Sequence, residues 1–183
     1  MNPPSGATIY EWGSDSSVDS IIAQFPVDTW PEAIQEWFSW ALYYTRGFFQ
    51  PLITSIVICS AIKAESSGDR NKHSGYVNEK GVLEDSVGLF QMYAKGAGRL
   101  YVPELNNGID RRLDPKVQFD VMVPQFRDRF ITSWNLGFRG PDLARDVCGH
   151  VERPKPEYWV AYATAWNSLV RDLPWKDYLQ EGF

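Results

Sequence analysis

The amino-acid sequence predicts a mainly helical α+β protein, with one small β element beside a bundle of helices. Apolar residues recur at helical spacing in several segments, and proline opens most of these segments, as it often does in the first turn of a helix. The segment from Pro51 is apolar on nearly every side, which is typical of a helix in the middle of a core. Residues 69–93 combine polar turns with short extended runs, which predicts a hairpin or extended lobe.

The 183 residues fit one domain, and a chain of this size buries enough apolar surface to fold without a metal or a disulfide. Its start is rich in Pro, Gly and Ser, which predicts an arm or loosely packed lead-in over residues 1–27, with one short helix over residues 18–24. We assign residues 28–183 to a single domain.

The beginning of the chain has neither a basic n-region nor an apolar h-region, so it does not read as a secretory signal. The longest apolar run, residues 51–64, is shorter than the roughly 20 residues that span a bilayer. We therefore expect no membrane span and synthesis as a soluble cytoplasmic chain.

Composition excludes two classes of site. The net charge is −5 and no basic cluster occurs, which disfavours binding to nucleic acid. Cys59 and Cys148 belong to no CxxC pair, and His73 and His150 lie far apart, so we expect no metal and no cofactor. Aromatic residues make up 15% of the chain, which fits either a well-filled core or a groove that stacks on sugar rings.

The first predicted helix covers residues 28–44. Asp28 or Thr29 is expected to cap it, Pro31 suits its first turn, and Glu32 suits the positive end of its dipole. The second helix begins at Pro51 and is expected to stop at Gly68.

Beyond the hairpin at residues 69–93, a short helix is expected over residues 91–101, broken by its two glycines. In the helix over residues 113–134, Asp114 is the expected cap and Pro124 predicts a kink or a restart. Two further helices, each opened by proline, are expected at residues 140–151 and 155–173.

One ionisable residue, Glu65, stands near the end of the buried segment, directly before two serines and a glycine. Burial and the negative end of the helix dipole both disfavour an ionised carboxylate at such a place. Lys63 is two residues away, so on a helix it points elsewhere. A general acid must keep its proton near neutral pH, and both effects favour the protonated form. The competing interpretation is a glutamate that is only the first exposed residue after a core helix.

Two segments, AIKAESSGDRN and DSVGLFQMY, together resemble the lysozyme-like superfamily, most closely the soluble lytic transglycosylases, goose-type lysozymes and phage-encoded relatives. The resemblance implies a helical bundle around a core helix, with a small β-hairpin lobe flanking a substrate cleft. It also implies that Glu65 is catalytic and that the glycine-rich segment forms the opposite wall. The matched residues are Glu65, Ser66, Gly68, Ser86, Gly88, Leu89 and Gln91.

Two more segments extend the resemblance over roughly residues 50–170. LDPKVQFDVMV resembles the helix after the cleft wall in transglycosylases, and GHVERPKPEYWVAYATAW resembles the ERP segment of phage tail lysozyme domains. The family's AYN triplet, which supplies a tyrosine and an asparagine to the sugar site, reads AWN here, ending in Asn167. Tyr162 lies one helical turn earlier and is the alternative source of the phenol.

The resemblance implies cleavage of the β-1,4 bond between N-acetylmuramic acid and N-acetylglucosamine, with Glu65 as general acid. The implied substrate-binding residues are Ser86, Gly88, Gln91, Tyr162 and Asn167. The alternatives are an ordinary turn at Gly88 and a structural hydrogen bond from Gln91 that ties the hairpin to a helix. Tyr93 and Trp166 are candidates either for stacking on sugars or for the core. A second carboxylate about 6.5–9.5 Å away would give an inverting hydrolase. Without one, the acetamido group of the substrate could attack and leave an anhydro sugar. The candidate carboxylates are Asp69, Glu79, Glu84 and Asp85.

The expected partner is the peptidoglycan glycan strand, joined by phage tail or other virion proteins if the chain is a virion lysin. The missing signal peptide and disulfides favour a phage product, made in the host cytoplasm and acting on the cell wall as a virion component or released endolysin. The alternative is a non-catalytic lysozyme-like structural or glycan-binding protein of a phage particle, which the altered AWN triplet favours.

Overall fold

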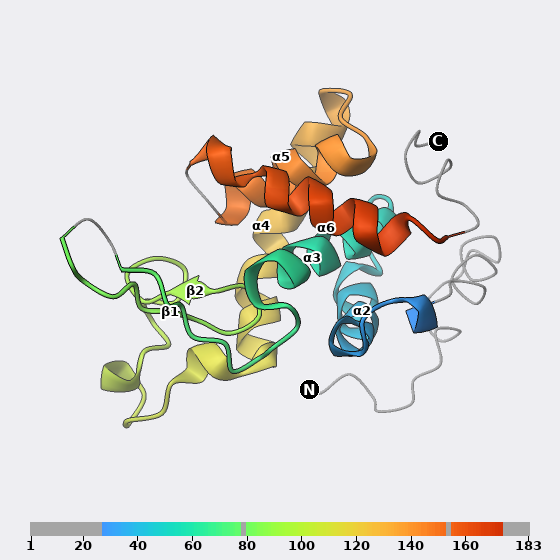
Figure 1. Cartoon of the computed structure of the whole chain (residues 1–183). Helices are drawn as coiled ribbons and strands as arrows, with labels where there is room; N and C mark the ends of the chain where they lie inside the picture. The colour runs from blue at the N-terminus through green and yellow to red at the C-terminus, as the bar shows by residue number, and fades with distance from the viewer. Residues whose placement is uncertain (1–26, 78–79, 153–154, 174–183) are drawn as a thin grey trace.

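The computed structural model describes residues 27–77, 80–152 and 155–173. This part of the chain is mainly helical, with one small antiparallel sheet of two strands, as the sequence predicts (Figure 1). The lead-in over residues 1–26, with its expected helix at residues 18–24, lies outside the described residues. The α-helices are α2 (Glu32–Thr45), α3 (Pro51–Ser66), α4 (Pro115–Asn135), α5 (Gly140–Glu152) and α6 (Val160–Val170). The strands are β1 (Ser86–Val87) and β2 (Met92–Tyr93), and the 3-10 turns are η2 (Val27–Thr29), η3 (Pro103–Leu105), η4 (Arg111–Leu113) and η5 (Pro156–Tyr158).

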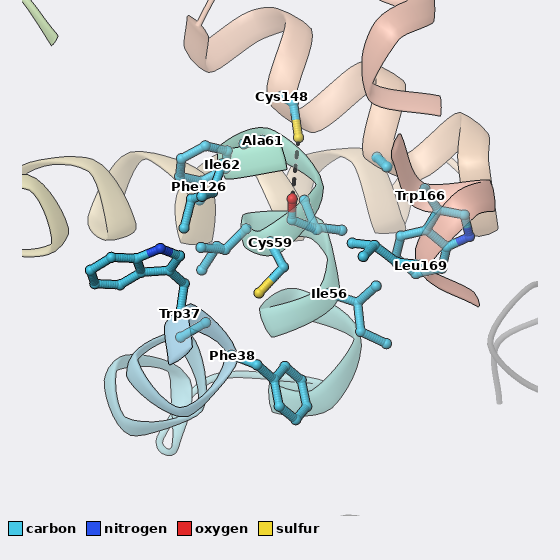
Figure 2. Close-up of a cluster of buried hydrophobic side chains, with 14 of the residues drawn as sticks. Trp37, Phe38, Ile56, Cys59, Ala61, Ile62, Phe126, Cys148, Trp166 and Leu169 are labelled. Carbon is cyan, nitrogen blue, oxygen red and sulfur yellow. Dashed lines mark hydrogen bonds between the residues drawn. The ribbon is translucent and has the colours of Figure 1, made fainter. Parts of the chain in front are cut away.

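Helix α3 occupies the centre of the helical bundle, as its uniformly apolar sequence predicts. Every residue from Leu52 to Ile62 is buried, and the helix packs against α2, α4, α5 and α6. Figure 2 shows side chains from all five helices meeting around it, with the thiol of Cys148 donating to the carbonyl of Val57 at 3.5 Å. A buried serine within the helix, Ser60, donates to the Ile56 carbonyl at 2.8 Å, so its hydroxyl adds no unpaired donor to the core.

Helix α2 begins later than the sequence predicts. The expected caps, Asp28 and Thr29, lie in the separate turn η2, and α2 starts at Glu32. Pro31 occupies the N-cap position with φ −54° and ψ 132°, and it makes no side-chain capping bond. The fixed φ of proline suits the start of a helix. The predicted caps, Asp28 and Thr29, are therefore wrong, whereas the prediction of a proline at the start of this helix is confirmed.

Helix α4 begins where the sequence predicts, and of the two outcomes expected at Pro124 the restart does not occur. The side chain of Asp114 accepts from the backbone N–H of Lys116 at 2.9 Å, which confirms the cap. Pro124 lies inside one continuous helix, so the chain does not restart there. Because Pro124 is on an exposed face, water can satisfy the carbonyl that has no N–H partner.

Residues 69–77 and 80–114 form a lobe beside the bundle, drawn in green and yellow at the left of Figure 1. Ser86 pairs with Tyr93 and Val87 with Met92 in the small sheet. Two isolated bridges, His73 to Val87 and Val77 to Leu83, extend an antiparallel hairpin ahead of it, as the polar stretch predicts.

The helix expected over residues 91–101 does not form, and most of this segment folds instead into successive turns. The carbonyl of Tyr93 accepts from both Gly96 and Gly98 N–H groups at 3.0 Å. Gly98 packs directly on Arg112, where an added Cβ would lie 2.6 Å from the Arg112 Cδ. Tertiary packing on this arginine therefore overrides the local helical pattern.

Arg112 anchors the lobe from within. Its side chain is 2% exposed and forms ion pairs with Asp110 at 2.6 Å and Asp85 at 2.9 Å. It also donates to the backbone carbonyl of Asp85 at 2.9 Å. The start of β1 is thereby fixed to the turn that precedes α4.

Candidate functional site

Glu65 is the penultimate residue of α3 and its side chain is half-buried. The helix ends immediately afterwards, because Ser67 takes φ 58° and its N–H donates back to the Lys63 carbonyl at 3.1 Å. Gly68 follows with φ 89°, a left-handed conformation that glycine adopts readily. The expected stop at the serine–glycine segment is therefore confirmed.

The turn after Glu65 is fixed against α2. The indole Nε1 of Trp37 donates to the carbonyl of Gly68 at 2.9 Å. A Cβ on Gly68 would lie 2.1 Å from the carbonyl oxygen of Ala33, so no side chain fits at this position. Close packing of α2 thus holds the end of α3, and with it the position of Glu65.

Tyr162 of α6 contacts Glu65 where α6 packs against α3. Its hydroxyl donates a hydrogen bond to Oε1 of Glu65, and its ring is fully buried. Burial raises the pKa of the Tyr162 phenol, and the nearby charges of Glu65 and Glu152 raise that pKa further. The phenol therefore remains protonated and acts as a hydrogen-bond donor.

Lys63 and Glu65, both within the described residues, form no hydrogen bond or ion pair with each other. Its Nζ donates to Oγ of Ser168 on α6 at 2.6 Å. Burial lowers the pKa of Lys63, and the charge of Arg171 lowers it further. Lys63 and Glu65 therefore both contact α6, but at different residues, Ser168 and Tyr162.

The predicted wall, around Gly88 and Gln91, is a tight turn between β1 and β2. Gly88 has φ 84°, and a Cβ there would lie 2.1 Å from Nε2 of Gln118 on α4. The Gln118 side chain is fully buried, and its Oε1 accepts from the Phe90 N–H at 3.1 Å. Glycine at position 88 is therefore required by contact with Gln118 as well as by its backbone angle.

The side chain of Gln91 closes the same turn. Gln91 has φ 47°, and its Nε2 donates to the carbonyls of Gly88 at 3.0 Å and Lys72 at 3.2 Å. These bonds join the turn to the hairpin arm at residue 72. The amide nitrogen thus has a structural task beside any contact with a sugar.

Ser86 is 2% exposed, and its Oγ donates to Oε1 of Glu84 at 2.7 Å. Its backbone carbonyl accepts from the Ser74 N–H at 2.8 Å. The hydroxyl and the carbonyl of Ser86 therefore both form hydrogen bonds within the lobe.

The described loop carboxylates each have an internal partner. Asp69 accepts from the Asn71 N–H at 2.8 Å, Glu84 accepts from Ser86, and Asp85 pairs with Arg112. The fourth candidate, Glu79, lies outside the described residues.

On α6 the AWN triplet divides between surface and core. Asn167 is exposed, and its carbonyl accepts from the Arg171 N–H at 3.0 Å as part of the helix end. Trp166 is fully buried among core residues, so it is not available to stack on a sugar. Of the two roles considered for Trp166, its burial supports the core role, whereas Tyr93 is 41% exposed.

Three residues that support the site were not singled out in the sequence: Trp37, Gln118 and Arg112. Each acts over a long sequence separation, and the contact partners are turns whose position depends on the fold. A buried glutamine in the apolar stripe of α4 is the one local signal available, because a buried polar side chain implies a partner.

No group of three or more His, Cys, Asp or Glu side chains suited to a metal ion occurs within residues 27–77, 80–152 and 155–173. In the same ranges no helix is long and apolar enough to cross a membrane.

Comparison with known proteins finds no matching family model, no matching curated protein and no matching solved structure.

Proposed function

We propose that this chain is a peptidoglycan-cleaving glycosidase that acts on the β-1,4 bond between N-acetylmuramic acid and N-acetylglucosamine. The observation that carries the proposal is the half-buried Glu65 at the end of the core helix, held by the Tyr162 hydroxyl. The lysozyme-like resemblance of the ES and GLFQ segments gives the substrate class.

In this proposal Glu65 donates its proton to the departing glycosidic oxygen. Tyr162 occupies Oε1, so the transferable proton belongs on Oε2. As the proton leaves, negative charge develops on the carboxylate, and the hydrogen bond from Tyr162 becomes charge-assisted and stronger. A donor that is fixed before the reaction stabilises this charge without reorganisation.

The second step is proposed to use the acetamido group of the substrate. The internal partners of Asp69, Glu84 and Asp85 favour this route over attack by water activated by a loop carboxylate. The acetamido oxygen would attack the anomeric carbon as the glycosidic bond breaks. Glu65, now ionised, would take the proton of the C6 hydroxyl as that oxygen displaces the acetamido oxygen, which gives a 1,6-anhydro sugar.

We further propose that the glycan lies between Glu65 and the turn at residues 88–91. Gly88 is buried and lets the turn pack on Gln118, and the bonds of Gln91 hold this turn rigid. Asn167 is an exposed contact on α6. The implied setting is a phage lysin, carried by the virion or released as an endolysin, with virion tail proteins as partners in the first case.

The second candidate is a non-catalytic glycan-binding or structural protein of a phage particle. The internal hydrogen bonds of Ser86 and Gln91 and the burial of Trp166 favour it, because these side chains have structural roles.

Turbidity clearance of purified cell walls separates the two candidates. We expect clearance by the wild type and a loss of about 10²–10⁴-fold in Glu65→Gln, which is near-isosteric and has no proton to donate. Glu36→Gln, on the exposed face of α2, is the matched control and should clear walls like the wild type. Binding to walls without clearance by the wild type would favour the second candidate. Mass spectrometry of the released fragments distinguishes anhydro from reducing ends, and reducing ends would refute the acetamido route.

A further inference from the structure

One end of the helical bundle carries aromatic rings and arginine side chains at its surface. The loop between α2 and α3 packs on the last turns of α4, where the ring centres of Phe49 and Trp134 lie 5.4 Å apart. The guanidinium carbon of Arg139 lies 3.6 Å from the centre of the Trp134 ring. That of Arg127 lies 5.6 Å from the centre of the Phe48 ring. We call this surface, formed by residues 46–50 and 127–139, the aromatic end.

Large apolar side chains of the aromatic end are open to water. Phe49 is 52% exposed, Ile131 is 42% exposed and Leu136 is 66% exposed. Scattered apolar residues are ordinary on a protein surface, but these lie beside the contacts between rings and arginines. Aromatic residues and arginine are also the types enriched at the centres of protein–protein interfaces. The aromatic end therefore has the composition of a docking site for a segment of protein.

Positive charge exceeds negative charge on the aromatic end. It contains four arginines and one acidic residue, Asp128, which pairs with the arginine before it. In adjoining α5 the acidic residues are paired as well, Asp146 with Arg129 at 2.6 Å and Asp142 with Arg145 at 3.4 Å. The two remaining arginines of the aromatic end form no ion pair with any described residue, so this surface is positive although the whole chain has a net charge of −5.

These two arginines, Arg46 and Arg139, are held over aromatic rings. The guanidinium carbon of Arg46 lies 4.3 Å from the centre of the Tyr43 ring. Nη1 of Arg139 donates to the carbonyls of Trp134 at 2.9 Å and Phe138 at 2.7 Å. A guanidinium group has five N–H donors and can bind a carboxylate through two of them. Because the rings already restrict both side chains, binding a carboxylate costs little further freedom.

The first part of the chain has the complementary composition. Residues 1–26, which lie outside the described residues, contain no Lys or Arg. Their acidic residues are Glu11, Asp15 and Asp19, and two aromatic residues, Tyr10 and Trp12, flank the first of these. This sequence therefore supplies both carboxylates for the arginines and rings for the exposed apolar side chains.

The chain is long enough for this contact. The described residues begin at Val27, shortly before α2, and the aromatic end lies where α2 finishes. The 14 residues of α2 span about 21 Å. The roughly 15 residues that separate Trp12 from Val27 can reach up to about 50 Å when extended.

We propose that the acidic segment at residues 10–19 docks on the aromatic end of its own chain. Its carboxylates bind the guanidinium groups of Arg46 and Arg139, and its aromatic side chains cover Phe49 and the neighbouring apolar residues. The aromatic end adjoins the first turn of α3, whereas Glu65 lies near the other end of this helix of 16 residues, about 20 Å along its axis. The docking is therefore separate from the candidate site and stands independently of the proposed glycosidase activity.

Paramagnetic relaxation enhancement in the full chain tests the proposal. Cys59 and Cys148 are fully buried, so a nitroxide attached to the variant Ser14→Cys labels one place. We expect the amide signals of the aromatic end to broaden and those of residues 100–110 in the lobe to remain sharp. Salt should reduce this broadening, because ions screen exposed charges, and a salt titration gives the equilibrium constant for docking.

Matched variants separate the contribution of charge from that of the rings. Arg46→Gln should lower the docking constant about two- to fivefold, the range expected for one exposed ion pair. Arg145→Gln, which changes an exposed arginine of α5, should leave the constant unchanged. Phe49→Ser should lower it at least about fivefold, whereas Leu105→Ser, at a 64% exposed position in the lobe, should have no effect.

A mixed sample distinguishes the segment of the same chain from other occupants. Nitrogen-15-labelled protein without a nitroxide, mixed with nitroxide-labelled protein at natural isotope abundance, should show no broadening at the aromatic end. Broadening in the mixture would overturn docking within one chain and assign the surface to the segment of a second copy. Sharp signals in both samples would overturn the proposal and leave the surface to a separate partner.

The thermal midpoint and far-UV circular dichroism verify that each variant is folded. Equal docking constants for Arg46→Gln and Arg145→Gln, or for Phe49→Ser and Leu105→Ser, would also overturn the proposal, because the aromatic end would then not be the site of contact.

Discussion

The hydroxyl of Tyr162 on α6 donates to Oε1 of Glu65 at the end of α3, so two residues 97 positions apart form one polar pair at the edge of the core. The phenol is fully buried and its pKa is raised, first by burial and then by the charges of Glu65 and Glu152. Tyr162 is therefore a hydrogen-bond donor that the bundle holds in place beside the carboxyl group of Glu65.

Tyr162→Phe removes this donor and keeps the ring. We expect a decrease of about 10²-fold in kcat on purified walls with little change in KM, because the lost bond strengthens only as charge develops on Glu65. The free energy of unfolding should fall by only about 1–2 kcal/mol, because water can replace the lost hydrogen bond at the half-buried carboxyl group of Glu65. Steady-state kinetics and urea unfolding measure the two effects. A change confined to KM would assign Tyr162 to substrate binding instead.

Gly88→Ala tests the contact between the turn and α4. The added Cβ would lie 2.1 Å from Nε2 of Gln118 and would also occupy a position with φ 84°. Gly81→Ala is the matched control, because Gly81 has φ 73° and open space around its Cβ position. We expect about 1 kcal/mol of destabilisation for Gly81→Ala and at least about 3 kcal/mol for Gly88→Ala. Equal losses in chemical unfolding would show that crowding by Gln118 is unimportant.

Arg112→Met should destabilise the protein by about 2–4 kcal/mol at neutral pH, because it leaves the half-buried carboxylate of Asp110 without its partner. Arg111→Met, at the exposed neighbouring position, should change stability by less than about 0.5 kcal/mol.

The loss in Arg112→Met should depend on pH. Burial alone would raise the pKa of Asp110, but the hydrogen bonds and charge of Arg112 outweigh burial and lower it below its usual value. Stability from this pair is present above the unfolded-state pKa of about 3.9 and is lost as pH falls through the lower folded-state pKa. Urea unfolding from pH 7 to pH 3 should therefore show the difference between wild type and variant narrowing below about pH 4. A constant difference would contradict the pairing.

Trp37→Phe removes the indole N–H that holds the Gly68 carbonyl, together with buried ring volume. We expect a loss of about 2–3 kcal/mol and a measurable loss of wall clearance, since the turn after Glu65 is released. Trp40→Phe is the control on the same helix: Trp40 is 9% exposed and packs against other aromatic rings. Its loss of stability should not be accompanied by a loss of clearance from the folded fraction.

Features governed by neighbouring residues were predictable from the sequence. The cap at Asp114, the central position of α3 and its end near Gly68 follow from side-chain chemistry and apolar pattern within a few residues. The expected helix at residues 91–101 failed because Gly98 packs on Arg112, a contact that no local pattern reveals.

The candidate site divides in the same way. The position of Glu65 at a helix end could be predicted, and Tyr162 was identified by its spacing from the AWN triplet, but the hydrogen bond between them depends on the packing of α6 against α3. The contact of Gln118 with Gly88 likewise joins residues that only the fold brings together. The catalytic roles themselves are still predictions.

The separation of Glu65 from Tyr162 also sets an order of events during synthesis. A ribosome adds about 5–20 residues per second, so the 97 positions between the two residues take on the order of 10 seconds to translate. Throughout that interval the nascent chain contains the acid of the pair without its phenol. Assembly of the pair is therefore tied to the arrival of the last described helix, and a chain that is released early carries an incomplete site.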